Sequence, residues 1–349
     1  MWPFWLMFLV PAFGVLVPRR LPAAQASVMW WVVGLLFAMM IGLRHEVGGD
    51  WFNYLPHFQH AATMSFAEAA GMGDPGHYVL NRLVAGLGGS IYTVNLIYAA
   101  VLMIGTVVFC RRQPNPWLAL LAAVPYMLIV GGMGYTRQSV ALGLALIGLV
   151  ALGEHRIRTF VICIALGALF HKSAVLLLPI AALASSRNRL LTGTIVLLST
   201  GLMYYLLLAE SAEAMWTNYV EADMQSSGGA IRVVMNAVPA VLLVVFRKRL
   251  VPEPGERKLW LWIAAFALLC VPLVGIASTA VDRVALYLIP LQLYVFARLP
   301  RLATTTRART AVVVGILGYY AAVQFVWLNF AAHAYAWLPY QFMPLEGWF

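Results

Sequence analysis

Four groups of charged and aromatic residues interrupt an otherwise apolar sequence, and they contain the side chains that bind phosphate. Arginine makes bidentate contacts with phosphate oxygens, and lysine supplies a compact positive charge. Several such cations around a diphosphate would also stabilise the charge that develops when it leaves during a reaction. The four groups are RHEVGGDWFNY (residues 44–54), GGMGYTRQSVA (131–141), LGALFHKSAVLLLP (166–179) and STAVDRVALY (278–287).

The same groups contain proton acceptors. Asp50, Glu46 or His171 would deprotonate a sugar hydroxyl placed beside it. A Gly-Gly pair allows a tight turn that returns Asp50 toward Arg44. The sequence contains neither a DxD-like motif nor a His/Cys cluster, so we expect no metal and no cofactor.

Each group also has a purely structural interpretation. Arg44 and Asp50 would form an ion pair beside an aromatic belt at the membrane interface. Arg137 would extend to a lipid phosphate, His171 would be a hydrogen-bonded packing residue, and the Asp-Arg pair at 282–283 would be an ion pair within one helix. Ionisable residues inside a membrane are costly and tend to mark functional sites. This favours the functional interpretation of His171, which adjoins a lysine in an apolar setting.

The elements that position these groups are membrane helices. Of 349 residues, 62% are hydrophobic and 10% are charged, whereas soluble proteins carry about 25% charge. We therefore predict an all-α polytopic membrane protein, folded as a single transmembrane domain over 1–349, with about twelve membrane segments that include short or broken helices. The predicted segments are 2–17, 26–43, 89–109, 117–131, 137–153, 157–170, 172–184, 190–208, 231–247, 258–277, 282–298 and 310–330.

The distribution of basic residues supports this topology, and it also identifies the few basic residues that the topology does not explain. Of 23 basic residues, 17 fall in breaks that the alternation assigns to the cytoplasm. The net charge of +10 thus follows from topology, and no nucleic-acid partner is predicted. Six cations fall on the outer side, where topology gives no reason for them, and we expect them to converge in an outward-facing cavity. They are Arg44, Arg82, Arg137, Lys172, Arg232 and Arg283.

The alternation depends on one break in the chain. A single helix over 157–184 would invert the charge of every later loop, so we predict two short segments separated at Phe170–His171–Lys172. Irregular backbone at that depth requires burial in protein or a wet cavity. Two outer loops are expected, namely 44–90 with amphipathic helices and 209–230.

Five segments together resemble the EpsG-like branch of Wzy-type polysaccharide polymerases. They occur in that family's order over about residues 40–295. The first fits the approximate family pattern R-x-x-x-G-x-D-x-x-x-Y. The segments are LRHEVGGDWFNY, DPGHYVLNRLV, GYTRQSVALGLAL, ALFHKSAVLLLP and DRVALYLIP.

The resemblance implies a bacterial inner-membrane glycosyltransferase with a C-type fold and an active site that faces the periplasm. Its substrates would be undecaprenyl-pyrophosphate-linked oligosaccharides, and a chain-length regulator protein is a possible partner besides membrane lipid. By the same resemblance the catalytic residues would be Asp50, His171, Arg137 and Arg283. Substrate and pyrophosphate would be bound by Arg44, Arg137, Gln138, Lys172, Arg232, Arg283, Tyr54 and Tyr135.

Two other functions fit the same residues. An O-antigen-type ligase would move glycan from the same carrier to a different acceptor. A transporter or flippase of polyprenyl-linked glycan would move the lipid without forming a bond. Ion-coupled transporters usually place carboxylates near the bilayer centre and have repeated halves, whereas the outward charges here lie at segment ends.

Overall fold

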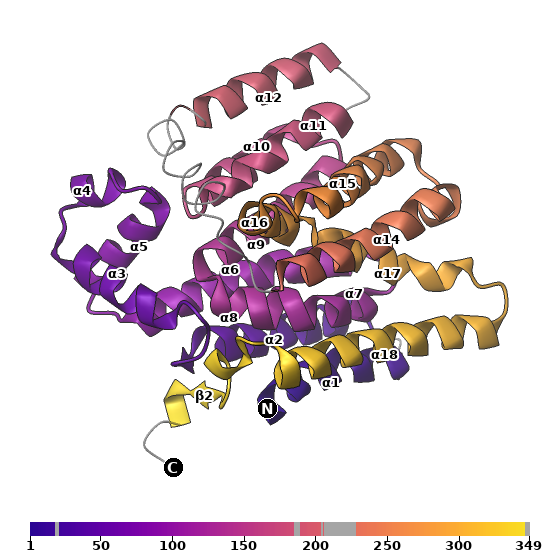
Figure 1. Cartoon of the computed structure of the whole chain (residues 1–349), viewed down its shortest axis with the longest axis horizontal. Helices are drawn as coiled ribbons and strands as arrows, with labels where there is room; N and C mark the ends of the chain where they lie inside the picture. Colours follow the sequence, from indigo (N-terminus) through magenta and orange to yellow (C-terminus); the bar gives the residue numbers. More distant parts are fainter. Residues whose placement is uncertain (18–20, 185–188, 204, 206–227, 346–349) are drawn as a thin grey trace.

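The computed structural model of the chain is built almost entirely of helices, as the sequence predicts (Figure 1). It describes residues 1–17, 21–184, 189–203, 205 and 228–345. Within these residues two short strands, β1 (Arg44–His45) and β2 (Gln341–Phe342), pair antiparallel. The helices are α1 (Trp2–Leu16), α2 (Ala23–Gly42), α3 (Trp51–Thr63), α4 (Phe66–Ala70), α5 (Pro75–Gly86), α6 (Ile91–Arg111), α7 (Pro116–Ala123), η1 (Val124–Gly131), α8 (Gly132–Gly134), α9 (Thr136–Gly153), α10 (Ile157–Ala168), η2 (Lys172–Leu177), α11 (Leu178–Ala184), α12 (Arg189–Met203), α14 (Gly229–Leu250), α15 (Pro254–Leu273), α16 (Ser278–Leu288), α17 (Pro290–Arg298), η6 (Leu299–Leu302), α18 (Thr306–Phe330), η7 (Ala334–Ala336) and η8 (Met343–Leu345).

Six helices in the described part of the chain are long and apolar enough to cross a membrane. They are α2, α6, the continuous stretch Pro116–Gly134, α9, α14 and α18. The pair Ser278–Leu288 and Pro290–Leu302, bent by 44°, makes a seventh if it is one broken span. Helices α1 and α10 are apolar but shorter than 18 residues. The structure thus supports a multi-pass membrane protein, while the count of twelve segments stays a prediction.

Close packing of α6 against α9 positions the start of α9. A Cβ atom added at Gly105 of α6 would lie 2.0 Å from the carbonyl oxygen of Gly143 of α9. Glycine at this crossing lets the two backbones touch, as small residues commonly do between membrane helices. Figure 1 shows α6, α7 and α9 in the middle of the bundle, with α12 on one edge and α1 and α18 on the other.

The segment 44–90 forms a small helical unit, α3 to α5, at one end of the bundle (Figure 1). Helix α3 buries Trp51 and Tyr54, and α5 buries His77 and Val84. Together with residues of α6 and α9, these aromatic and aliphatic side chains make a second hydrophobic cluster apart from the main core. Helices α3 and α5 each carry both buried and exposed side chains, and the assignment of this segment to an outer loop stays a prediction. Most of the second predicted loop, residues 209–227, lies outside the described residues, as do Arg19, Arg20 and Arg187.

The chain leaves helical geometry at the predicted break. Helix α10 ends at Ala168, His171 is extended (φ −153°, ψ 109°), and η2 begins at Lys172. The irregular backbone places His171 between two short helices and Lys172 at the start of the second.

The C-terminal segment fastens the turn between α2 and α3. The backbone N–H of Gly48 donates to Ala336 O (2.7 Å), and the N–H of Met343 donates to Leu43 O (2.9 Å). The indole of Trp337 donates to Ile129 O (3.1 Å) and lies against Gly49 and Gly134. The turn that precedes Asp50 is therefore held from both sides.

Gly48→Ala is expected to loosen this turn. Gly48 has φ +110°, and a Cβ atom there would lie 2.1 Å from Met133 O. Backbone in this region costs a non-glycine residue about 1–3 kcal/mol before the overlap is counted. Thermal unfolding in detergent should show the loss. Gly49→Ala is the matched control, because its Cβ would make only ordinary contacts with Trp337 (3.6 Å); equal melting temperatures for the two variants would contradict the prediction.

Candidate functional site

Charged residues meet where several helices begin. Asp50 is the N-cap of α3 and Asp74 the N-cap of α5, while Arg137 is the second residue of α9 and Lys172 the first of η2. A carboxylate at a helix start is favoured by the helix dipole, whereas a cation there is disfavoured. The two cations therefore occupy positions that need a compensating negative charge.

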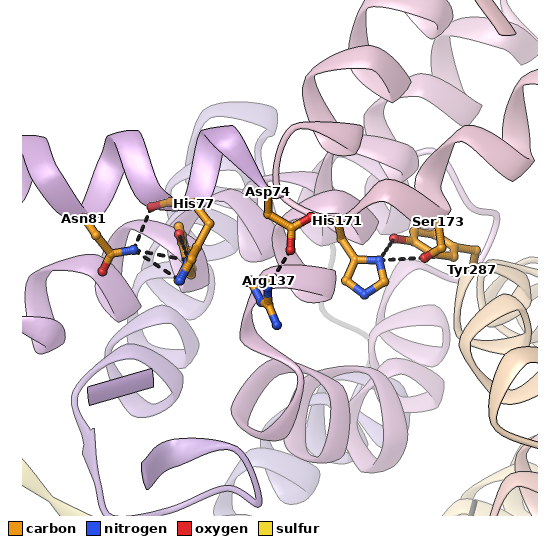
Figure 2. A network of polar contacts seen from close by, with 8 residues as sticks. Asp74, His77, Asn81, Arg137, His171, Ser173 and Tyr287 are labelled. Carbon is orange, nitrogen blue, oxygen red and sulfur yellow. Dashed lines mark hydrogen bonds and ion pairs between the residues drawn. The ribbon is translucent and has the colours of Figure 1, made fainter. Parts of the chain in front are cut away.

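Part of that charge comes from Asp74. Its carboxylate accepts a 2.5 Å hydrogen bond from Nη1 of Arg137, with side-chain exposures of 14% and 30% (Figure 2). The guanidinium also lies 5.7 Å from the ring centre of Tyr54, within the range of a cation–π contact. The buried Nε of Arg137 has no hydrogen-bond partner among the described residues. The Asp74–Arg137 ion pair is thus partly exposed, and the Nε–H of Arg137 remains available as a hydrogen-bond donor.

Asp50 belongs to the same cluster. Burial raises the pKa of its carboxyl group, while the charges of Arg137 and Arg283 act to lower it. Burial likewise raises the pKa of Asp74, against the opposing charges of Arg137, Lys172 and Arg283. Both carboxylates therefore lie within electrostatic reach of the same two guanidinium groups. Three cations and two carboxylates leave an excess of positive charge, which suits an anionic ligand.

His171 faces this cluster from the break after α10. Its Nδ1 lies 2.6 Å from Ser173 Oγ and 3.5 Å from the hydroxyl of Tyr287. The charges of Arg283 and Arg137 both act on His171, and Figure 2 shows its Nδ1 turned toward Ser173 and Tyr287. Two hydroxyl groups thus orient the ring.

The structure adds residues that the sequence had not singled out as site residues. Asp74 is the direct partner of Arg137, and the buried Nδ1 of His57 has no hydrogen-bond partner among the described residues. Burial and the charge of Arg137 lower the pKa of His57, which favours its neutral form. The DPG sequence was the available signal, because an aspartate before proline is a common helix N-cap.

His77 lies on α5, one turn after Asp74. It is buried, and its Nδ1 lies 2.8 Å from the hydroxyl of Tyr98 and 3.2 Å from Asn81 Nδ2 (Figure 2). Burial lowers its pKa to about 3, so it is neutral at physiological pH. Its hydrogen bonds indicate a structural role.

Arg44 lies apart from the cluster. It is fully buried, donates to Ile41 O (2.6 Å) and Val47 O (2.8 Å), and reaches Thr136 Oγ1 (3.2 Å). The tight turn forms as predicted, but Asp50 interacts with Arg137 and Arg283 instead of forming the ion pair with Arg44. Arg44 supports the residue that precedes Arg137.

Arg232 and Asp282 form a buried bidentate pair between α14 and α16. Asp282 on α16 therefore forms an ion pair with Arg232 on another helix. The structural interpretation had expected an ion pair within one helix, between Asp282 and Arg283. Tyr135 connects this pair to the cluster, since it interacts electrostatically with both Arg232 and Asp50.

The remaining predicted residues occupy different places. Gln138 donates to the backbone oxygen of Arg283 (2.8 Å) and so joins α9 to α16. Arg82 lies outside the cluster, where it donates to Met64 O (2.7 Å) and lies 5.2 Å from the Phe66 ring centre. Within the described residues no group of three His, Cys, Asp or Glu side chains is placed to hold a metal ion.

The long apolar helices define a multi-pass membrane protein, with a mixed-charge cluster where several of its helices begin. The sequence model of the EpsG family matches residues 27–342, nearly the whole chain. The chain belongs to the EpsG family, whose members are relatives of Wzy-type polymerases, and membership indicates a membrane polysaccharide polymerase of the glycosyltransferase kind. No curated protein and no solved structure matches the chain.

Proposed function

We propose that this protein polymerises undecaprenyl-pyrophosphate-linked oligosaccharide repeat units at the periplasmic face of the bacterial inner membrane. The lipid pyrophosphate is the leaving group, and the reaction needs no metal. The observation that carries the proposal is that Arg137 and Arg283 act on two partly buried carboxylates, Asp50 and Asp74, and that Lys172 acts on Asp74 as well. Cations of this kind suit a diphosphate, and carboxylates suit the proton of an acceptor hydroxyl.

The chemical step uses both kinds of group. The acceptor hydroxyl oxygen bonds to the anomeric carbon of the donor glycan as the bond from that carbon to the diphosphate breaks. The electron pair leaves with the diphosphate, where Arg137, Lys172 and Arg283 stabilise the developing charge. The hydroxyl proton passes to Asp50, and His171 is the second candidate acceptor. Tyr135, which is only partly buried, would offer an aromatic face to a sugar, whereas Tyr54 is buried and supports Arg137 instead.

Reconstitution with lipid-linked repeat units tests the proposal. A ladder of products that forms in the presence of a chelator supports a metal-independent polymerase. Transfer only to a non-carrier acceptor would indicate a ligase instead, and movement of the lipid across the bilayer without bond formation would indicate a flippase. Either of these outcomes would overturn the proposal.

The acid side of the pH profile should report Asp50. Only its ionised form accepts a proton, so transfer is expected to fall as the pH drops through its pKa, which burial raises above the ordinary aspartate value. Arg283→Gln removes one charge that lowers this pKa, so the acid midpoint should move to higher pH. Rates normalised to each variant's own maximum measure this. An unmoved midpoint would count against Asp50 as the base.

Asp50→Asn is expected to abolish transfer without destabilising the protein. A folded-state pKa raised above the unfolded value means that ionisation costs stability at neutral pH; this cost shrinks as the pH falls below the folded pKa and is gone below the unfolded pKa. Asparagine removes the cost, so the melting temperature should stay equal or rise. A lower melting temperature together with retained transfer would assign Asp50 a structural role.

A further inference from the structure

An apolar cavity of about 690 Å³ lies between α14 and α18. Its wall is mostly aliphatic and aromatic and includes Ile231, Val234, Val326 and Phe330. These four side chains are exposed at the surface of the bundle. In a membrane the cavity therefore opens sideways toward lipid.

One part of the cavity wall is polar. Tyr126, Tyr135 and Arg232 contribute to it, and the guanidinium of Arg232 lies 5.9 Å from the ring centres of both tyrosines. Asp282 holds Arg232 in place. Tyr135 also interacts electrostatically with Asp50. The polar part of the cavity wall thus lies within electrostatic range of the charged cluster.

We infer that this cavity binds the isoprenoid chain of the lipid-linked donor. The inference rests on the proposed function and locates the lipid part of its donor substrate. A single apolar chain with an anionic end matches an apolar cavity that has the Arg232 guanidinium in its wall and the charged cluster within electrostatic range. The units nearest the diphosphate fill the cavity, and the remaining chain passes between α14 and α18 into the bilayer. The diphosphate would then lie in the part of the cavity that contains Arg232 and Tyr135, on the side of the charged cluster to which Arg137 belongs.

Photo-crosslinking tests the inference in the full-length protein in lipid nanodiscs. The probe is a polyprenyl diphosphate with a diazirine on its chain, and labelled peptides are mapped by mass spectrometry. Labelling is expected on α14 and α18 and should be competed by undecaprenyl diphosphate. Val326→Trp fills the cavity and should reduce labelling about tenfold, which corresponds to about 1.4 kcal/mol.

Val314→Trp is the matched control. Val314 lies on the same helix with nearly the same exposure, 53% against 52% for Val326, but does not line the cavity. Equal loss or equal retention of labelling in the two variants would overturn the inference. Equal competition by phosphatidylglycerol would do so too, because it would identify a general lipid site. The assay requires no sugar transfer, so its outcome is separate from that of the polymerase test.

Discussion

Arg137→Ala is expected to leave the protein in the membrane and to reduce polymer formation at least about 100-fold. Removal of one donor that stabilises a developing charge typically costs a factor of 10²–10³. Arg137 bonds to Asp74, contacts Tyr54 and acts on Asp50, so it contributes to each part of the site. The rate of ladder formation by the reconstituted variant measures the effect.

Two further variants separate catalysis from folding. Arg82→Ala removes a cation of α5 that lies outside the cluster, and it should retain activity. Asp74→Asn combined with Arg137→Ala removes the unpaired carboxylate that the single variant leaves behind. If this double variant regained full activity, Arg137 would serve only to neutralise Asp74.

Asp282→Asn is expected to have the largest effect on stability. Arg232 is 5% exposed and Asp282 holds it bidentately. Removal of one partner of a buried ion pair leaves an uncompensated charge and costs about 3–5 kcal/mol. Thermal or denaturant unfolding in detergent should show this loss. Asp74→Asn should cost less, because its partner Arg137 is 30% exposed and remains near Asp50.

Replacing both partners tests what the buried pair is for. Apolar side chains of similar volume in place of a buried ion pair are often neutral or stabilising, so Arg232→Met with Asp282→Leu should regain stability. If this stable variant also polymerises at the normal rate, Arg232 does not bind pyrophosphate. A stable variant with weakened donor binding would support that role.

Much of the candidate site was predictable because its residue types are conspicuous in an apolar chain. Arg137, Asp50 and His171 were singled out as candidates from their charge and position, and the break before Lys172 followed from the alternation of basic residues. Asp74 was not identified as a site residue, because its role arises only when α5 packs near the start of α9. That contact joins residues 63 positions apart, beyond the range of any local pattern.

The sequence by itself determined the helical class, the membrane environment, the family and the set of ionisable residues from which a site could form. These properties depend on composition and short-range order, since hydrophobic runs and single charges act locally. Only the tertiary structure decided which cations share a site. Arg44 and Arg137 look equivalent in the sequence, yet one is satisfied by nearby backbone carbonyls and the other meets Asp74. Helix packing determines the partners of each arginine, because a buried guanidinium must be hydrogen-bonded and the surrounding helices decide which acceptors lie near it.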